Sequence, residues 1–405
     1  MIIKNIRIVD DIQDFIGDIL VREGVVAAVG KNLPNNEELQ YDYSGQKVVL
    51  LPAFTDLHAH FRDPGFTYKE DVISGSRAAI SGGFTAVNLM PNTNPVCSSL
   101  ELVKDVEKRI QEVGIITANQ TLSMTKDLQG KDYEHLKKLK KEEILFVTDD
   151  GKGVNDDMVM EEIFKICKEK EIIIMSHAED SRYSATDMRK AENEMTFRDL
   201  RLCEKLEGKI HFCHVSTIEA IEAIAEYKAK GVQVTCEVTP HHITATGEET
   251  NHYRVNPPLR EQKDIDALIK AIQGGVVDAI ATDHAPHTTE DKINGAPGMT
   301  GLEIAFPLSY TALVKTGKIT LQQLVKIMST TPSAMMRLKK GRVGEGLDAD
   351  FVIVELETPY MIDSAQFVSK GKNTPFRGKK VYGKIIGIFR KGILYKKEPY
   401  ITQNN

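Results

Sequence analysis

The sequence predicts an α/β fold, namely a (β/α)8 barrel with a small sheet domain formed by both ends of the chain. Three observations lead to this prediction. Eight apolar, β-rich runs recur through the middle of the chain, helical stretches separate most of them, and both ends alternate apolar and polar residues. Eight β/α units in about 280 residues match the size of such a barrel.

Both ends of the chain have the pattern of short strands. Residues 1–50 alternate apolar and polar side chains between glycine-containing turns, and residues 349–356 and 381–397 do the same. Chain termini often lie near each other in such a layout. We therefore expect residues 1–50 plus 340–405 to form one small β domain, and residues 51–339 to form a catalytic barrel.

The middle of the chain consists of apolar runs with helical connectors. The runs are PAFTDL (52–57), FTAVNLM (84–90), GIITANQ (114–120), EILFVT (143–148), EIIIMS (171–176), KIHFC (209–213), VQVTCEV (232–238) and VDAIAT (277–282). Strands that alternate with helices imply a parallel sheet. A doubly wound open sheet shows the same alternation, so periodicity alone leaves it as the alternative.

Polar side chains follow most of these runs, at the strand end where a barrel places its active site. They are His58 and His60 after the first run, Asn92 after the second, Asp149 and Asp150 after the fourth, His177 after the fifth, His214 after the sixth, and Asp283 after the eighth. An open sheet would spread these residues along a line, whereas a barrel brings them to one mouth. Their placement therefore favours the barrel.

Taken singly, most of these residues have a structural explanation. An HxH pair such as His58 and His60 is often accidental, although its side chains share one face of a strand. His177 or His214 alone could be a buried, hydrogen-bonded histidine. A purely structural role becomes improbable when histidines and aspartates suited to a metal follow five of the eight runs.

Four histidines and two aspartates are too many for one tetrahedral zinc ion, and they suit two metals that share a bridging carboxylate. The first metal would take His58, His60, one aspartate of the 149–150 pair and Asp283, and the second would take that same aspartate, His177 and His214. Such a centre would activate a water molecule for attack. Asp283 beside it could accept or donate the proton.

Arg62 and Asn92 emerge beside the predicted metals. They indicate a substrate carboxylate held by charge-assisted hydrogen bonds, although Arg62 could instead pair with Asp63 or Glu70.

Other histidines and cysteines near the strand ends are weaker candidates. His241 and His242 follow the seventh run and could line the mouth, whereas His211 is expected to be structural. A zinc site of Cys213, His214 and Cys236 is conceivable, but its spacing is not that of a structural zinc site.

Composition and charge exclude several classes of protein. With 405 residues and a net charge of -6, the chain has no electrostatic footprint for nucleic acid or for an anionic membrane. It has neither the apolar core of a signal peptide nor a run long enough to cross a bilayer. Its five cysteines are odd in number and lack CxxC spacing. We therefore expect reduced thiols and a cytoplasmic location.

Long motifs along nearly the whole chain resemble the dihydroorotase family of the amidohydrolase superfamily. They are LPAFTDLHAHFRDPG, FTAVNLMPNTNP, VTDDG, SHAED, FCHVST, EVTPHHI, NPPLR, ATDHAPH, GLEIAFPL, GRVGEGLDADFVIVEL and NTPFRGKKVYGKI. The resemblance implies a distorted (β/α)8 TIM barrel with a small β-sandwich domain formed by both termini. It also implies the reversible closure of N-carbamoyl-L-aspartate to dihydroorotate and water, in pyrimidine synthesis, with one or two Zn²⁺ per subunit.

The resemblance further assigns roles to individual residues. The implied metal ligands are His58, His60, Asp150, His177, His214 and Asp283, with Asp150 as the bridging ligand and Asp283 also as the catalytic acid/base. The implied substrate contacts are His60, Arg62, Asn92, Asn256, His287, Pro297 and Gly298. Many superfamily relatives carry a carboxylated lysine at the position of Asp150, so this chain resembles the branch that uses aspartate there. The sequence leaves open whether one or two zinc ions are held.

The expected partners are a small-molecule substrate, a second copy of the chain in a homodimer, and aspartate transcarbamoylase. Two alternative functions stay open. Another cyclic amidohydrolase, such as a hydantoinase or allantoinase, usually has the bridging lysine and lacks the clamp of Arg62, Asn92 and His287. A non-catalytic dihydroorotase-like partner of aspartate transcarbamoylase would have lost metal ligands, whereas this chain keeps the full set.

Overall fold

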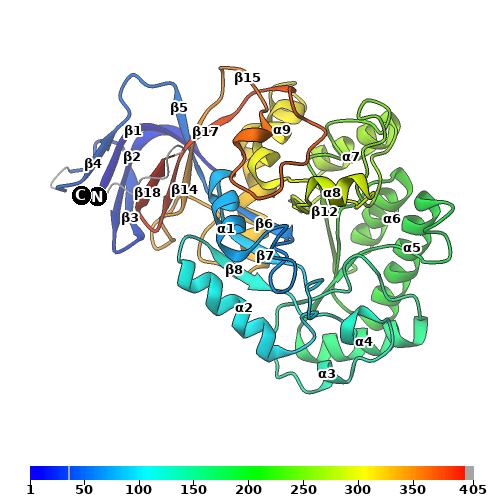
Figure 1. The fold of residues 1–405 in the computed structure, drawn as a ribbon. Helices are drawn as coiled ribbons and strands as arrows, with labels where there is room; N and C mark the ends of the chain where they lie inside the picture. The colour runs from blue at the N-terminus through cyan, green and yellow to red at the C-terminus, as the bar shows by residue number, and fades with distance from the viewer. Residues whose placement is uncertain (35–36, 397–405) are drawn as a thin grey trace.

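A computed structural model describes residues 1–34 and 37–396, and it contains the predicted barrel (Figure 1). Each of the eight apolar runs forms a strand. The strands are β6 (Phe54–Ala59), β7 (Phe84–Leu89), β8 (Thr117–Gln120), β9 (Phe146–Val147), β10 (Ile173–Ser176), β11 (Ile210–Phe212), β12 (Val234–Val238) and β13 (Ala279–Ile280). All their pairings are parallel.

Two isolated bridges close these strands into a ring. The strands form one sheet of β6-β7-β8 and a second of β13-β12-β11-β10-β9. Leu122 pairs with Val147 to join the sheets at one seam, and Ala59 pairs with His284 to join them at the other. The doubly wound alternative is therefore wrong, because an open sheet leaves its edge strands unjoined. The barrel is distorted, because in the part of the chain that the structure describes only a single bridged residue pair joins the two sheets at each of these junctions.

Long helices surround the strands (Figure 1). They are α1 (Val72–Ser81), α2 (Leu100–Val113), α4 (Asp157–Lys170), α5 (Met188–Leu206), α6 (Ile218–Ala229) and α7 (Gln262–Gln273). Oxygen-bearing side chains accept hydrogen bonds from free backbone N–H groups at their first turns, for example Asp71 before α1 and Thr217 before α6. One apolar face of each helix is buried against the strands.

Shorter helical segments complete the barrel and its rim. They are η1 (Lys126–Leu128), α3 (Glu134–Lys137), α8 (Thr289–Ile293), η2 (Leu302–Ile304), α9 (Ala305–Ser309), η3 (Tyr310–Val314), α10 (Leu321–Val325), η4 (Lys326–Thr330), α11 (Thr331–Met335) and η5 (Ser364–Gln366). No helix within residues 1–34 and 37–396 is long and apolar enough to cross a membrane.

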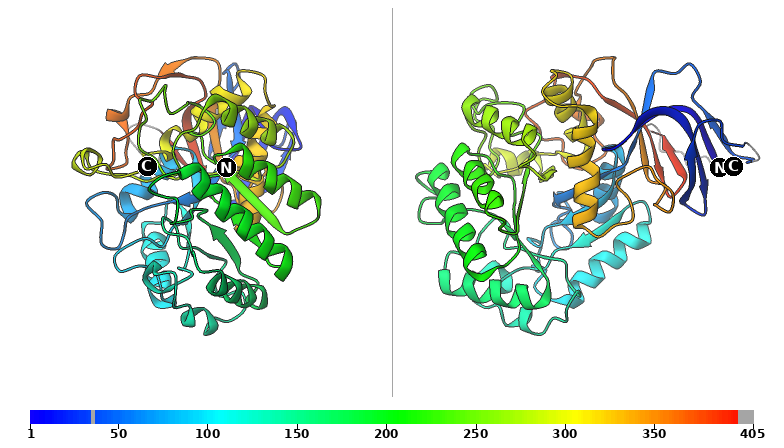
Figure 2. Two further views of the ribbon diagram at one scale, coloured as in Figure 1. Left: turned by 90° about the vertical axis from the view of Figure 1, so that its right-hand side faces the viewer. Right: turned by 180° about the vertical axis from the view of Figure 1, so that it is seen from behind.

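Strands from both ends of the chain form one continuous sheet to one side of the barrel (Figure 2). Its order is β18-β17-β14-β5-β1-β2-β3, and β4 pairs with β1. The bounds are β1 (Ile2–Val9), β2 (Asp14–Arg22), β3 (Val25–Gly30), β4 (Gln40–Asp42), β5 (Val48–Pro52), β14 (Phe351–Glu355), β17 (Lys384–Arg390) and β18 (Ile393–Lys396). The strands that were expected to form a β-sandwich belong to one sheet by their hydrogen bonds, and its side chains pack in a core of their own. A separate pair, β15 (Tyr360–Met361) and β16 (Lys380–Val381), lies outside this sheet.

The division of the chain into two domains stays a prediction. The terminal sheet reaches Pro52 and resumes at Phe351, close to the expected boundaries at residues 50 and 340. Residues 397–405 of the predicted small domain lie outside the described residues. The sheet touches the barrel directly, since β5 is separated from β6 by Ala53 alone.

Candidate metal centre

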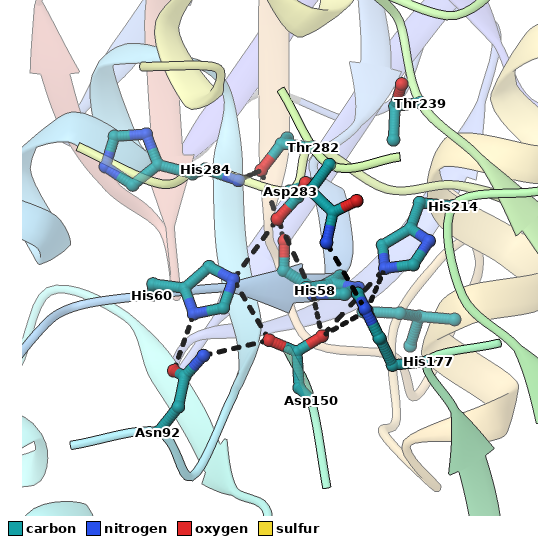
Figure 3. Close-up of polar contacts among 12 residues, drawn as sticks. His58, His60, Asn92, Asp150, His177, His214, Thr239, Thr282, Asp283 and His284 are labelled. Carbon is teal, nitrogen blue, oxygen red and sulfur yellow. Dashed lines mark hydrogen bonds and ion pairs between the residues drawn. The ribbon is translucent and has the colours of Figure 1, made fainter. Parts of the chain in front are cut away.

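The strand ends bring the six predicted ligands into one cluster (Figure 3). The cluster consists of His58 in β6, His60 directly after β6, Asp150 after β9, His177 after β10, His214 after β11 and Asp283 after β13. None of these residues is more than 6% exposed. Charged and polar groups this deeply buried are costly unless they are paired or bind an ion.

Asp150 occupies the centre of the cluster (Figure 3). Its Oδ1 atom lies 3.3 Å from His58 Nε2, 3.4 Å from His177 Nδ1 and 3.9 Å from His214 Nε2. Its Oδ2 atom lies 3.6 Å from His60 Nε2. One carboxylate therefore faces all four histidines, as a ligand shared between two cations would.

The neighbouring Asp149 points away from the cluster. It accepts hydrogen bonds from the backbone N–H of Thr125, at 2.9 Å, and from the Thr125 hydroxyl. Burial raises the pKa of Asp149 to about 6, although these hydrogen bonds oppose the rise. The residues alone did not decide which of the two aspartates joins the centre. The Asp149 side chain points toward Thr125, so only Asp150 can contribute.

Asp283 faces the first pair of histidines. Its Oδ1 atom lies 3.1 Å from His60 Nε2 and 3.6 Å from His58 Nε2. Its backbone has a φ of 45°, which is uncommon for a residue with a side chain. The preceding Thr282 is fixed by Asp56, which accepts from the Thr282 backbone N–H at 2.9 Å and from its hydroxyl at 2.6 Å. Asp56 thereby holds the backbone that turns Asp283 into the centre.

The hydrogen bonds of His58 suit metal binding. Its Nδ1 atom lies 2.9 Å from Glu237 Oε1, and a carboxylate accepts rather than donates, so the proton of a neutral imidazole sits on Nδ1. Nε2 then carries a lone pair, is buried, and has no hydrogen-bond partner within the described part of the chain. This lone pair faces the oxygens of Asp150 and Asp283. The lone pair and the carboxylate oxygens repel one another unless a cation or a proton lies between them.

The pKa shifts of His58 and Asp150 also indicate that the cluster favours positive charge. Burial opposes protonation of His58, but the carboxylate of Asp150 raises the pKa of this imidazole well above its usual value. Burial opposes ionisation of Asp150, but His58, His177 and His214 lower its pKa well below its usual value. The cluster therefore fits a group that brings positive charge. Imidazole nitrogens and carboxylate oxygens are the donors that zinc and similar divalent metals prefer.

Arg62, His287 and Pro297 lie together on one side of the cluster. Arg62 Nη2 is 3.4 Å from His287 Nε2, and Arg62 Nε is buried with no hydrogen-bond partner among the described residues. His287 Nε2 donates to the carbonyl oxygen of Pro297 at 2.8 Å. Burial and the charge of Arg62 lower the pKa of His287 to about 3, so this ring stays neutral. The free donors of Arg62 are suited to an incoming carboxylate.

Gly298 follows Pro297 where the chain passes close to the barrel. A side chain there would meet the Ala285 Cβ atom at 2.7 Å, and the backbone has a φ of 125°. Only glycine fits this position.

Asn92 and Asn256 lie at different edges of the centre. Asn92 accepts from His60 Nδ1 at 2.8 Å and donates to Asp150 Oδ2 at 3.0 Å. Asn256 lies on the side of His177, where its Nδ2 atom is 3.5 Å from His177 Nε2. The predicted substrate contacts therefore surround the metal centre, and their roles stay predictions.

The alternative zinc site with two cysteines does not form. Cys213 lies in the barrel interior, whereas Cys236 packs in the outer layer and its Sγ atom is 3.6 Å from the carbonyl oxygen of Val276. Burial raises the pKa of both thiols to about 12, so both stay protonated.

The remaining histidines differ in their surroundings. His211 bonds Thr235 and Glu237, as expected of a structural residue. His242 bonds Thr239 and the carbonyl of Pro257.

The sequence matches the model of the amidohydrolase family over residues 49–394. The chain belongs to this family. It is 47% identical to the dihydroorotase of Clostridium botulinum (strain Eklund 17B / Type B), over 98% of this chain and 100% of the relative. It is 38% identical to the dihydroorotase of Elusimicrobium minutum (strain Pei191), over 95% of this chain and 94% of the relative.

Solved hydantoinase structures share the fold. The L-hydantoinase (dihydropyrimidinase) from Arthrobacter aurescens has a TM-score of 0.86 at 25% identity, covering 98% of this chain and 96% of that one. A D-hydantoinase structure has a TM-score of 0.87 at 24% identity, covering 99% of this chain and 96% of that one. This agreement supports a barrel with a β-rich terminal domain.

Three carboxylates of this amidohydrolase were not anticipated from the sequence. Glu237 contacts His58, Asp56 fixes Thr282, and Glu179 accepts from His177 Nε2 at 2.9 Å. Glu237 and Asp56 had a detectable signal, because each is an acidic residue inside an otherwise apolar run. Glu179 had none, since an acidic residue in a loop is ordinarily solvated.

Proposed function

We propose that this amidohydrolase is a dihydroorotase, which reversibly closes N-carbamoyl-L-aspartate to dihydroorotate and water in pyrimidine synthesis. The observation that carries the proposal is the 47% identity to a dihydroorotase over 98% of this chain and all of the relative. The position of Asp150 supports it, because this aspartate faces all four histidines of the centre.

A hydantoinase is the second candidate, because hydantoinase structures share the fold. Identities of 25% and 24% are far below the identity to the dihydroorotases. Hydantoinases usually have a lysine at the position that bridges the two metals, whereas this chain has Asp150 there. The buried Arg62 also favours a substrate that carries a carboxylate, which hydantoin lacks.

We propose that the cluster holds one or two Zn²⁺ ions. His58, His60, Asp150 and Asp283 would hold the first, and Asp150, His177 and His214 would hold the second. When bound, a divalent cation supplies Lewis acidity to the carbonyl group under attack.

Asp283 is the proposed proton carrier. In the hydrolytic direction, a water oxygen forms a bond to the ring carbonyl carbon while Asp283 accepts a proton from that water. The carbon–nitrogen bond of the ring then breaks, and Asp283 returns the proton to the departing nitrogen. His60 and His58 lower the pKa of Asp283 despite its burial, so the carboxylate is ionised when the water arrives.

Arg62, Asn92 and His287 are proposed to hold the α-carboxylate of the substrate, with Asn256, Pro297, Gly298 and His60 as further contacts. Among the residues that the structure describes, none forms a hydrogen bond with Arg62 Nε, which supports this assignment. A substrate held on this side places its reacting carbonyl toward Asp150 and Asp283.

Side-by-side assays of dihydroorotate, hydantoin and allantoin test the proposal. We expect turnover of dihydroorotate, loss of turnover after chelation, and recovery when Zn²⁺ is restored. Turnover of hydantoin without turnover of dihydroorotate would establish the second candidate instead. A purified protein with neither bound metal nor activity would indicate a non-catalytic scaffold.

The homodimer and the association with aspartate transcarbamoylase stay predictions. Light scattering of the purified chain, alone and mixed with the transcarbamoylase of the same organism, tests both. A cytoplasmic location also stays a prediction, which fluorescence microscopy of a tagged chain tests.

A further inference from the structure

Glu179 lies three residues beyond the end of β10, in the loop that leads to α5. Its side chain is 17% exposed, so the carboxylate is mostly withdrawn from solvent. It borders a cavity of about 480 Å³ that Asn256, Arg254 and Pro297 also line. Glu179 therefore separates the metal centre from a space that a small molecule can enter.

One oxygen of Glu179 serves two different partners. Oε2 accepts from His177 Nε2 at 2.9 Å and from Asn256 Nδ2 at 2.8 Å. His177 follows β10, whereas Asn256 lies in the segment between β12 and α7. A single carboxylate atom thus ties a predicted metal ligand to a predicted substrate contact across two loops of the barrel mouth.

The contact with His177 decides which nitrogen faces the centre. Because the carboxylate only accepts, a neutral His177 keeps its proton on Nε2. The lone pair is then on Nδ1, which lies 3.4 Å from Asp150 Oδ1 and 2.9 Å from His214 Nε2. Without Glu179, His177 could place its proton on Nδ1, where it would block metal binding.

The contact with Asn256 decides how that amide is turned. The NH₂ group points to Glu179, so the carbonyl oxygen of Asn256 is left to face another partner. An unrestrained amide could rotate by half a turn and exchange the two groups.

We propose that Glu179 is a positioning residue that couples metal binding at His177 to substrate binding at Asn256. The coupling to substrate rests on the proposed dihydroorotase function, whereas the effect on metal does not. Loss of this carboxylate loosens both partners together, so occupancy of the second metal position and affinity for substrate fall in the same variant.

The metal arm of the test uses Glu179→Ala, Glu179→Gln and Asp180→Ala in the full chain. Zinc stoichiometry and affinity are measured by calorimetry, and the visible absorption of the Co²⁺-loaded protein reports ligand geometry. We expect Glu179→Ala to weaken the more loosely held metal about 10- to 100-fold and to alter the Co²⁺ bands. Glu179→Gln keeps an accepting oxygen and should recover part of the loss.

Asp180→Ala is the matched control, because Asp180 lies in the same loop but pairs with the exposed Arg182 at 2.5 Å. It should retain the metal affinity and the Co²⁺ spectrum of the unmodified chain. An equal loss in Asp180→Ala would mean that loop disorder, and not the carboxylate of Glu179, is the cause. Unchanged metal affinity and an unchanged spectrum in Glu179→Ala would overturn the proposal.

The substrate arm compares KM for dihydroorotate in Glu179→Ala, Asn256→Ala and the double variant. Coupling predicts that Asn256→Ala raises KM strongly in the unmodified chain but only slightly once Glu179 is absent. If the KM increases of the two single variants simply multiplied in the double variant, the two residues would act independently and the coupling would be overturned. If the unmodified chain turned over no dihydroorotate, the proposed function would fail while the metal arm would still decide the role of Glu179 at His177.

Discussion

The Nδ1 atom of His58 lies 2.9 Å from Oε1 of Glu237, and both residues are completely buried. The second oxygen of Glu237 lies 3.0 Å from His211 Nε2, so the carboxylate is held from two sides. Burial opposes ionisation of Glu237, but its hydrogen bonds to His211 and His58 lower its pKa to about 2. An ionised carboxylate behind a metal ligand fixes the proton of the imidazole and increases its basicity.

Glu237→Gln should weaken metal binding. The amide of glutamine can donate to His58 Nδ1, which would move the imidazole proton to Nε2 and toward the metal. We expect the affinity for Zn²⁺ to fall about 10- to 100-fold, as measured by calorimetry or by competition with a chelator. Cys213→Ala is the control, since this buried thiol stays protonated beside the same histidine. Equal zinc affinities in Glu237→Gln and the unmodified chain would contradict this role.

Asp150→Ala and the adjacent Asp149→Ala should fail in different ways. Asp150 faces the four histidines, so its loss should remove bound metal and abolish turnover. Asp149 bonds Thr125 instead, so its loss should lower the free energy of unfolding by about 1–3 kcal/mol and spare the metal. Metal analysis and denaturant unfolding of both variants measure this difference. Retention of full metal content by Asp150→Ala would refute the central position of this residue.

Asp283→Ala should abolish turnover. Without a group to carry the proton, we expect kcat to fall by about 100-fold or more. The first proposed metal position should also weaken, because Asp283 Oδ1 lies 3.1 Å from His60, which is proposed to bind the same metal. Steady-state kinetics at saturating Zn²⁺ separates the two effects. Near-normal kcat in Asp283→Ala would assign the proton transfer to another group.

Arg62→Met should mainly weaken substrate binding. Methionine keeps much of the length of the side chain but removes the donors to the carboxylate, so KM should rise about 10- to 100-fold with a smaller change in kcat. Arg182→Met is a suitable control, since Arg182 is 72% exposed and pairs with Asp180 of its own loop. A fall in kcat at unchanged KM would mean that Arg62 acts on the reacting atoms and not on the carboxylate.

The fold was predictable from the sequence because a parallel strand buried on both faces appears as an apolar run. All eight runs became barrel strands in the expected order. The closure of the ring was less visible, since it depends on single bridges such as Ala59 with His284. A sheet domain from both ends of the chain was predicted, but its strand order was not, because that order depends on long-range pairing such as that of β5 with β14.

The clustering of the proposed ligands was predictable because each lies at or within three residues of the end of a strand, where a barrel exposes its side chains. The residues alone left the choice between Asp149 and Asp150 open, and only the family resemblance named Asp150. The choice depends on the hydroxyl and backbone N–H of Thr125, which approach Asp149 from a separate loop. Glu179 was missed for the same reason, because its partner Asn256 lies far along the chain. Motifs identify the residues that react, whereas the groups that orient them are brought together only by the fold.

Lys340 lies buried where the terminal sheet meets the barrel. Its Nζ atom is 3.3 Å from the carbonyl oxygen of Phe54 in β6 and 3.7 Å from Asp350 Oδ2. Asp350 also pairs with Arg390 of β17 at 3.1 Å. Burial lowers the pKa of Lys340 from its ordinary 10.5 to about 8, although Asp350 opposes the shift.

The lowered pKa of Lys340 predicts that the free energy of unfolding rises with pH above pH 8. Below pH 8 the Lys340 amine is protonated in both the folded and the unfolded chain, and burying the charged amine opposes folding. Between pH 8 and 10.5 the unfolded chain binds more protons than the folded one, so the free energy of unfolding should rise with pH. Lys340→Met should remove this rise, whereas Lys339→Met, at the adjacent exposed lysine, should keep it. Denaturant unfolding from pH 7.5 to 10 measures the three slopes, and equal slopes for the unmodified chain and Lys340→Met would show that this lysine titrates as it does in water.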